Sequence, residues 1–183
     1  MVAKYCQWDG YPGGQGIQAL HFLRDEFDRD QFEAGLQNVK TIHGDLQKRW
    51  AQVGAKDGRA TMEQSDTFKE RWPSLHRDMG TDILPYIQES EGEVPVTDSL
   101  DFARDSLFCE WAYVVDLDEE TFEVYKGFNN DPVDPEARFF TDDPYESYSG
   151  EIYYPVRLVQ KWKLGDLPQD DMFMNSCYPE DSE

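Results

Sequence analysis

The chain has 183 residues, 14% of them aromatic, and a formal net charge of −21 at pH 7. This length suits one domain with a substantial core, and the aromatic share is too high for a disordered acidic polypeptide. The charge disfavours direct binding to nucleic acid or anionic membranes. No apolar run approaches the ~20 residues that span a bilayer, so we expect a cytoplasmic protein.

The first half of the sequence has mainly helical patterns. A short strand is predicted over residues 3–8, followed by a glycine-rich loop that ends at Gly16. Apolar residues at helical spacing then predict a helix of about three turns from Ile17 to Phe27. Further helices are predicted after an aspartate N-cap at position 28 or 30, after Asp45, over 62–72, and as two short pieces within 75–87.

The second half changes to strand patterns after residue 91. Aromatic and β-branched residues alternate on both sides of an acidic turn, which predicts a β-hairpin with strands over 109–116 and 121–128. A loop over 129–150 and a further strand within 151–164 follow. We therefore predict an α+β fold, in which the N-terminal strand and several helices pack on a mostly antiparallel sheet from the second half.

The acidic residues concentrate in that second half. Met1–Ser90 holds 14 acids and 11 bases, net −3, and Glu91–Glu183 holds 24 acids and 6 bases, net −18. Such a surface confers solubility, and it also attracts a basic partner. Residues 1–165 are predicted to form one α+β domain, and residues 166–183 an acidic, loose tail.

Three segments of the sequence carry a resemblance to a known group of proteins. They read KYCQWDGYPGGQG, HRDMGTDILPYI and SLFCEWAYVVDLDEETFEVYKGF. They resemble the recurring blocks of a family of uncharacterised proteins from fungi, bacteria and their phages. Because the blocks span most of the chain, the resemblance concerns the whole domain. The family has no established activity, so it implies no catalytic residues for this chain.

The glycine-rich segment Cys6–Gly16 has two interpretations. Tyr11-Pro12-Gly13-Gly14 fits a type II turn and Asp9-Gly10 a further turn pair, so the glycines need no ligand. Alternatively, the loop and the following helix N-terminus form a ligand site, although GKS, GKT and GxGxxG patterns for phosphate are absent. In that case we expect an uncharged or cationic group, and the ligand-loop residues are Trp8, Asp9, Tyr11, Gly13 and Gly14.

The same segment contains candidate catalytic residues of a hydrolase-type enzyme. Cys6 as nucleophile, His21 as base and Asp9 as orienting acid are residue types that nucleophilic catalysis uses. Alternatively, a cysteine at an inward strand position is a small core residue. No metal or cofactor site is predicted, because the histidines are scattered and the cysteines are widely spaced without a CxxC pair.

The loop over 129–150 is the candidate partner site. Its aromatic and acidic side chains suit a basic, partly apolar partner, because aromatic rings anchor a complex and charges steer its formation. The alternative is an Ω-type loop whose rings pack on the sheet. The candidate partner-binding residues are Phe139, Phe140, Asp142, Asp143, Tyr145 and Glu146.

These patterns predict an acidic, non-enzymatic binding protein that engages a basic macromolecular partner, a class that includes inhibitors and nucleic-acid mimics. The alternative is a small-molecule enzyme or binder that uses Cys6–Gly16. A scaffold in a larger assembly is a third hypothesis, and it predicts exposed apolar surface on the helices. We expect no cofactor, no membrane association and no direct contact with nucleic acid.

Overall fold

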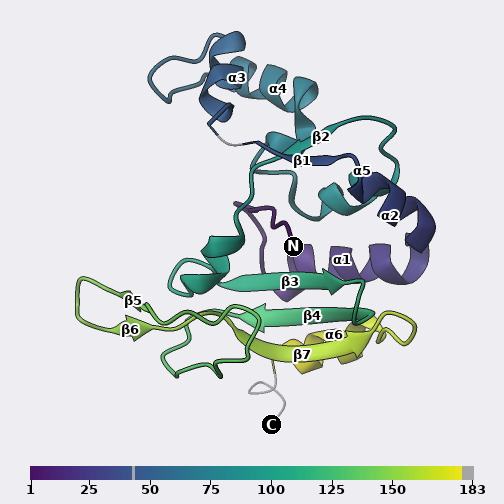
Figure 1. Ribbon diagram of the computed structural model, residues 1–183, viewed down its shortest axis with the longest axis vertical. Coiled ribbons are helices and arrows are strands. Elements are labelled where there is room, and N and C mark those ends of the chain that lie inside the picture. The colour runs from purple at the N-terminus through teal and green to yellow at the C-terminus, as the bar shows by residue number, and fades with distance from the viewer. Residues whose placement is uncertain (43, 179–183) are drawn as a thin grey trace. The chain divides into compact units, whose positions relative to one another are not determined.

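The computed structural model describes residues 1–42 and 44–178, which divide into two units (Figure 1). Unit 1 comprises Met1–Trp8 and Phe27–Ser99, and unit 2 comprises Asp9–Glu26 and the chain from Leu100 onward. Each unit is built from two separated segments, and the single domain over 1–165 stays a prediction. Residues 179–183 of the predicted tail lie outside the described residues.

Unit 1 is mainly helical and contains a two-stranded parallel sheet, β1–β2. The Asp28 carboxylate accepts the backbone N–H of Gln31 at 2.9 Å, so this aspartate caps a helix as predicted. Thr61 and Gln64 form a capping box at the start of another helix. The elements are α2 (Arg29–Leu36), β1 (Val39–Thr41), α3 (Leu46–Gln52), α4 (Met62–Arg71), η3 (Pro73–Leu75), η4 (Gly80–Asp82), α5 (Ile83–Gln88) and β2 (Val94–Val96).

The strand predicted over residues 3–8 is wrong, because these residues have no regular secondary structure. Their backbone groups bond to two different segments of unit 1. Ala3 N donates to the Asp98 carboxylate at 3.0 Å, and Gln7 N donates to the Arg77 carbonyl at 3.2 Å. Hydrogen bonds to separate loops hold this segment without building a ladder.

Unit 2 contains the antiparallel three-stranded sheet, in the order β3–β4–β7, which confirms the predicted α+β fold. The predicted hairpin forms with slightly shorter strands, and the N-terminal segment is helical from Pro12 to Glu26 with a π-helical turn at each end. The elements are η1 (Pro12–Gly16), α1 (Ile17–His21), η2 (Phe22–Glu26), η5 (Leu100–Arg104), β3 (Trp111–Asp116), β4 (Thr121–Lys126), β5 (Tyr145–Glu146), β6 (Ile152–Tyr153), β7 (Arg157–Lys163) and α6 (Asp170–Cys177).

The two faces of this sheet differ in character, because successive side chains of a strand point to opposite sides. On one face, the Phe122 ring stacks with Trp162 of β7 at 6.2 Å between centroids and with Phe173 of α6 at 6.1 Å. Helix α6 packs against β7 on this apolar face (Figure 1). On the other face, Thr121, Glu123 and Tyr125 alternate with these apolar residues, so this face is polar.

Helix α6 corrects the prediction of a loose tail from residue 166. The side chains of Phe173 and Cys177 are fully buried. The acidic residues of the helix lie in its first turn, at Asp170 and Asp171, where negative charge suits the helix dipole. Apolar residues four apart therefore dock this segment on the sheet despite its acidic composition.

Candidate functional site

The glycine-rich segment begins a helix, so the predicted type II turn is wrong. Tyr11 is an N-cap with extended backbone and Pro12 occupies the first helical position of η1. Gly13 lacks the positive φ that position three of a type II turn requires. Proline at this place is favoured because its fixed φ is already helical and a first-turn N–H is not needed.

Close packing inside unit 2 explains two of these glycines. A Cβ added to Gly14 would lie 2.3 Å from the carbonyl oxygen of Asp9, and one added to Gly16 would lie 2.8 Å from the Tyr113 ring. The Asp9 carbonyl accepts the N–H of Gln15 at 2.8 Å, and Asp9 itself has a φ of 55°. These contacts favour the structural interpretation of the segment, although the side chains of two predicted ligand-loop residues, Trp8 and Tyr11, are exposed.

The predicted catalytic residues each have a different neighbour from the one expected. The Cys6 thiol donates to the Trp8 carbonyl at 3.1 Å. The Nε2 atom of His21 lies 2.9 Å from Oδ2 of Asp170 on α6, so Asp170 rather than Asp9 is the acid that faces this histidine. Cys6 belongs to unit 1, whereas Asp9 and His21 belong to unit 2. The His21–Asp170 pair thus joins two helical segments of unit 2.

Unit 1 brings together a serine, a histidine and an aspartate that sequence analysis missed. Ser65 Oγ lies 3.2 Å from Nε2 of the buried His76, and Nδ1 of His76 accepts the backbone N–H of Asp78 at 3.3 Å. Nδ1 also lies 3.6 Å from Oδ2 of Asp78. The Ser65–His76 contact links α4 to the turn that follows η3.

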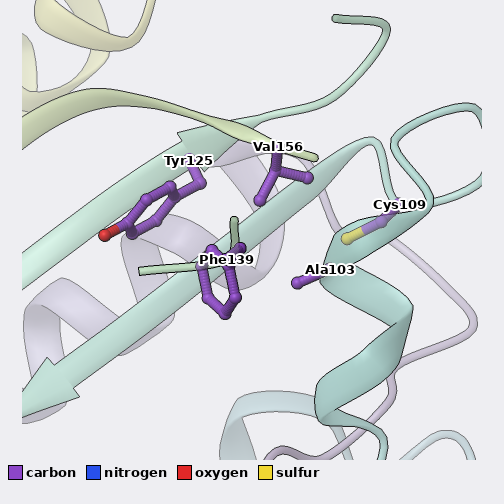
Figure 2. Close-up of a cluster of buried hydrophobic side chains, with 5 residues drawn as sticks. All are labelled: Ala103, Cys109, Tyr125, Phe139 and Val156. Atoms are coloured by element: carbon purple, nitrogen blue, oxygen red, sulfur yellow. The ribbon is translucent and has the colours of Figure 1, made fainter. Parts of the chain in front are cut away.

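The loop predicted as a partner site divides into a packed part and an exposed part. Phe139 is buried, and its ring meets Tyr125 edge-on with 4.9 Å between centroids. Figure 2 shows these two rings together with the other buried residues of the cluster, Ala103, Cys109 and Val156. Phe139 is therefore a core residue, as the Ω-loop alternative expects.

The acidic members of the predicted partner site are at the surface. The side chains of Asp142, Asp143 and Glu146 are exposed, and those of Phe140 and Tyr145 are half-buried. The Tyr145 ring packs edge-on against Phe108 with 6.1 Å between centroids. The exposed carboxylates thus remain available for a partner, whereas part of the aromatic content serves the fold.

A buried carboxylate organises the polar face of the sheet. Glu123 is 2% exposed, and its two carboxylate oxygens accept hydrogen bonds from β4, β7 and the loop after β4. Arg138 donates from Nε to Oε2 at 2.9 Å and from Nη2 to Oε1 at 3.1 Å, and Lys161 Nζ lies 3.0 Å from Oε1. Tyr125 completes the set by donating its hydroxyl to Oε2 at 2.6 Å.

These contacts fix the protonation states of the cluster. Burial alone would raise the pKa of Glu123, but hydrogen bonds from Arg138, Tyr125 and Lys161 lower it below its ordinary value. Burial and the hydrogen bond to Glu123 raise the pKa of Tyr125 to about 12. At neutral pH Glu123 is therefore a carboxylate, Tyr125 a neutral phenol and Arg138 a cation, whose pKa its acceptors raise further. These three shifts lead away from neutrality, so the arrangement suits binding better than proton transfer.

Beside this cluster lies a pocket of about 610 Å³. Its polar floor contains Glu123, Tyr125, Arg138 and Lys161, and its wall is the segment 131–139. The remaining lining is Asn129, Pro155, Val156, Arg157 and Leu158, which adds apolar side chains and one further cation. A concave site that combines apolar side chains with convergent polar groups is a candidate small-molecule site.

Sequence reasoning missed this site, although a signal for it exists. Residues at positions 121, 123 and 125 share one face of a strand, and antiparallel pairing with β7 places Lys161 opposite Glu123. Pairing the two predicted strands in register would have found this charge pair. Arg138 lies in an irregular loop, so no periodic pattern in the sequence predicts that its side chain points toward the sheet.

Comparisons with known proteins leave the family of this chain open. No family model, curated protein or solved structure matches it, so the resemblance carried by the three sequence blocks stays a prediction. Over the described residues, no cluster of three histidines, cysteines or acids has the geometry to hold a metal ion. Within residues 1–42 and 44–178, no helix is long and apolar enough to cross a membrane.

Proposed function

We propose that the protein is a non-enzymatic binding protein whose acidic loop in unit 2 engages a basic macromolecular partner. The observation that carries this proposal is the direction of one arginine. Residues 129–151 contain a single base, Arg138, and its guanidinium is held inward by Glu123 and Asp116. The seven acids of the segment therefore face the surroundings without a base from their own loop: Asp131, Asp134, Glu136, Asp142, Asp143, Glu146 and Glu151.

Exposed apolar groups accompany this charge. β5 and β6 form a short hairpin that projects beyond the ends of β4 and β7 (Figure 1), with the fully exposed Tyr148 in its turn. Ile152 and Phe108 also have exposed side chains near this hairpin. Aromatic anchors beside acidic groups favour a basic partner with some apolar surface, because the charges accelerate encounter and the rings contribute buried area.

The partner class includes proteins with a nucleic-acid groove. Carboxylates spaced along an exposed loop present the sign of charge that such a groove attracts, and this supports the inhibitor or mimic form of the proposal. Binding of this kind depends on ionic strength, because surface charges are screened by salt.

The test begins with capture of partners from a host extract at two salt concentrations, followed by titration of the purified partner. The variant D142N/D143N/E146Q removes three exposed charges from the loop. We expect it to weaken binding about tenfold or more, which corresponds to roughly 0.5 kcal/mol for each rim charge. The affinity of the unchanged protein is expected to fall as salt increases.

The control variant E63Q/D66N/E70Q neutralises three exposed acids of α4 in unit 1. It changes the net charge by the same amount, so it separates the local surface from the total charge. Full binding by this control supports the proposal. Equal weakening by both variants, or an affinity that salt does not change, would contradict it.

A further inference from the structure

We propose that the pocket beside Glu123 binds a small zwitterionic ligand, whose carboxylate contacts Arg138 and Lys161 and whose ammonium group contacts the acids of segment 131–136. This proposal concerns a second, small-molecule site and does not depend on the macromolecular partner. It rests on unused donor groups, exposed acceptor groups and apolar side chains that line the same pocket.

The floor contains donors that the fold does not use. Arg138 donates from Nε to Glu123 and Tyr125, and from Nη2 to Asp116 and Glu123. Its Nη1 has no acceptor among the described residues, and the only buried side-chain nitrogen or oxygen without a partner in that part of the chain is Asp105 Oδ1. Nη1 therefore reaches the solvent of the pocket that Arg138 lines.

Lys161 supplies a second donor at the same place. Its side chain is 40% exposed and its ammonium group has three protons, of which the contact with Glu123 Oε1 at 3.0 Å uses one. Glu123 accepts at both oxygens from four side chains and has no capacity for a ligand. It acts as a positioning residue that fixes the two cations before the ligand arrives, which lowers the entropy cost of binding.

Negative charge also lines the pocket. Asp131, Asp134 and Glu136 are exposed, as are the cations Lys161 and Arg157, whereas only 20% of the Arg138 side chain is exposed. Asp134 keeps its orientation because its Oδ1 accepts the backbone N–H of Glu136 at 2.8 Å. The pocket therefore presents charges of both signs, and Arg138 is the most buried of its three cations.

This pattern selects among ligand classes. A purely basic group would be repelled by the three cations of the lining, and a polyanion such as a phosphate would be repelled by its three exposed acids. A zwitterion can pair with groups of both signs at once. Val133, Phe139, Val156 and Leu158 also line the pocket, so an apolar body on the ligand is favoured.

The test uses three probes that differ only at the charged ends: L-leucine, N-acetyl-L-leucine and L-leucinamide. Binding to the full chain is followed by chemical-shift changes in two-dimensional ¹H–¹⁵N NMR spectra, at backbone amides 131–139 and at the Arg138 Nε–H. We expect saturable shifts with L-leucine and at least about tenfold weaker binding of both blocked probes, because each lacks one charged hydrogen-bonding end.

Two variants test which residues contact the carboxylate and which contact the ammonium group of the ligand. K161Q is expected to weaken L-leucine about tenfold, and K163Q is the matched control, because Lys163 lies on the same strand, bonds the Glu119 carbonyl and does not line the pocket. D134N keeps its Oδ1 acceptor, and it should weaken L-leucine while leaving N-acetyl-L-leucine unchanged. Unshifted pocket amides, equal binding of the three probes, or equal effects of K161Q and K163Q would overturn the proposal.

Discussion

Replacement of Glu123 by glutamine tests whether one buried carboxylate holds the polar face of the unit 2 sheet together. Glutamine keeps the shape and one oxygen acceptor but removes the charge. Arg138 and Lys161 then lose their shared counter-ion, while Arg138 retains Asp116 at 2.6 Å. We expect E123Q to lower the free energy of unfolding, because desolvated cations without compensation are costly.

The magnitude follows from the exposure of each partner. Loss of one member of a buried ion pair costs about 3–5 kcal/mol. The Arg138 side chain is only 20% exposed, so its two bonds to Glu123 carry most of the effect. The Lys161 side chain is 40% exposed, and solvent screening limits its share to less than about 1 kcal/mol. With Asp116 still in place, we expect a loss of about 2–3 kcal/mol, or a fall in Tm of about 4–12 °C.

The assay is urea and thermal unfolding followed by near-ultraviolet circular dichroism, which reports the aromatic rings packed on the sheet. E119Q is the matched control, because Glu119 lies in the adjacent turn with an exposed side chain, and we expect it to change stability by less than about 0.5 kcal/mol. A loss in E123Q no greater than that in E119Q would refute the reasoning.

The pH dependence of E123Q gives a second readout. The fold lowers the pKa of Glu123 from its ordinary value of 4.5, so the unfolded chain takes up this proton first as the pH falls. The stability that ionised Glu123 contributes is therefore fully present above 4.5 and is lost as the pH falls through the folded-state pKa. The difference between the unchanged protein and E123Q should shrink over that acidic range. A constant difference would mean that the charge of Glu123 is not its cause.

Three further predictions concern other parts of the molecule. G16A should destabilise the protein by about 1–3 kcal/mol in urea unfolding, because its Cβ would lie 2.8 Å from the Tyr113 ring, whereas G10A, with open space around it, should not. Burial lowers the pKa of His76 below 6.5. The stability that neutral His76 contributes is therefore present above pH 6.5 and is lost as the pH falls through the lower pKa of the folded state. H76Q should flatten this part of a curve of stability against pH. Burial also raises the pKa of Cys109 to about 12, so iodoacetamide at mildly alkaline pH should label this thiol only after unfolding, as mass spectrometry of the native and denatured protein would show.

The elements predicted correctly are those with a local physical cause. The hairpin before and after residues 117–120 follows from alternating side chains around a turn, and the Asp28 side chain caps the helix that it precedes. The parallel pair β1–β2 was missed because each strand has three residues, and β2 contains Pro95. Such short strands have no detectable period, and their pairing depends on contacts that are remote in sequence.

The candidate site was predicted only in part for a related reason. Exposure of Asp142, Asp143 and Glu146 agrees with a solvated acidic loop, and composition alone supports that expectation. The inward direction of Arg138 and the burial of Phe139 depend on how an irregular loop returns to the sheet. No local rule fixes that path, so the pocket and its donors emerge only from the tertiary structure.

The inward direction of the Arg138 side chain explains how the acidic second half of the chain folds and still presents a negative surface. Arg138 and Lys161 converge on Glu123, and Lys163 donates to the Glu119 carbonyl at 2.8 Å. Each of these bases donates to acceptors of the sheet, and none of them pairs with the acids of residues 129–151, a range that the structure describes in full. The carboxylates of residues 129–151 consequently give the surrounding solution a negative potential. This potential extends over about a Debye length, ~8 Å at physiological salt. Charge separation between sheet and loop is thus one structural cause of both proposed sites.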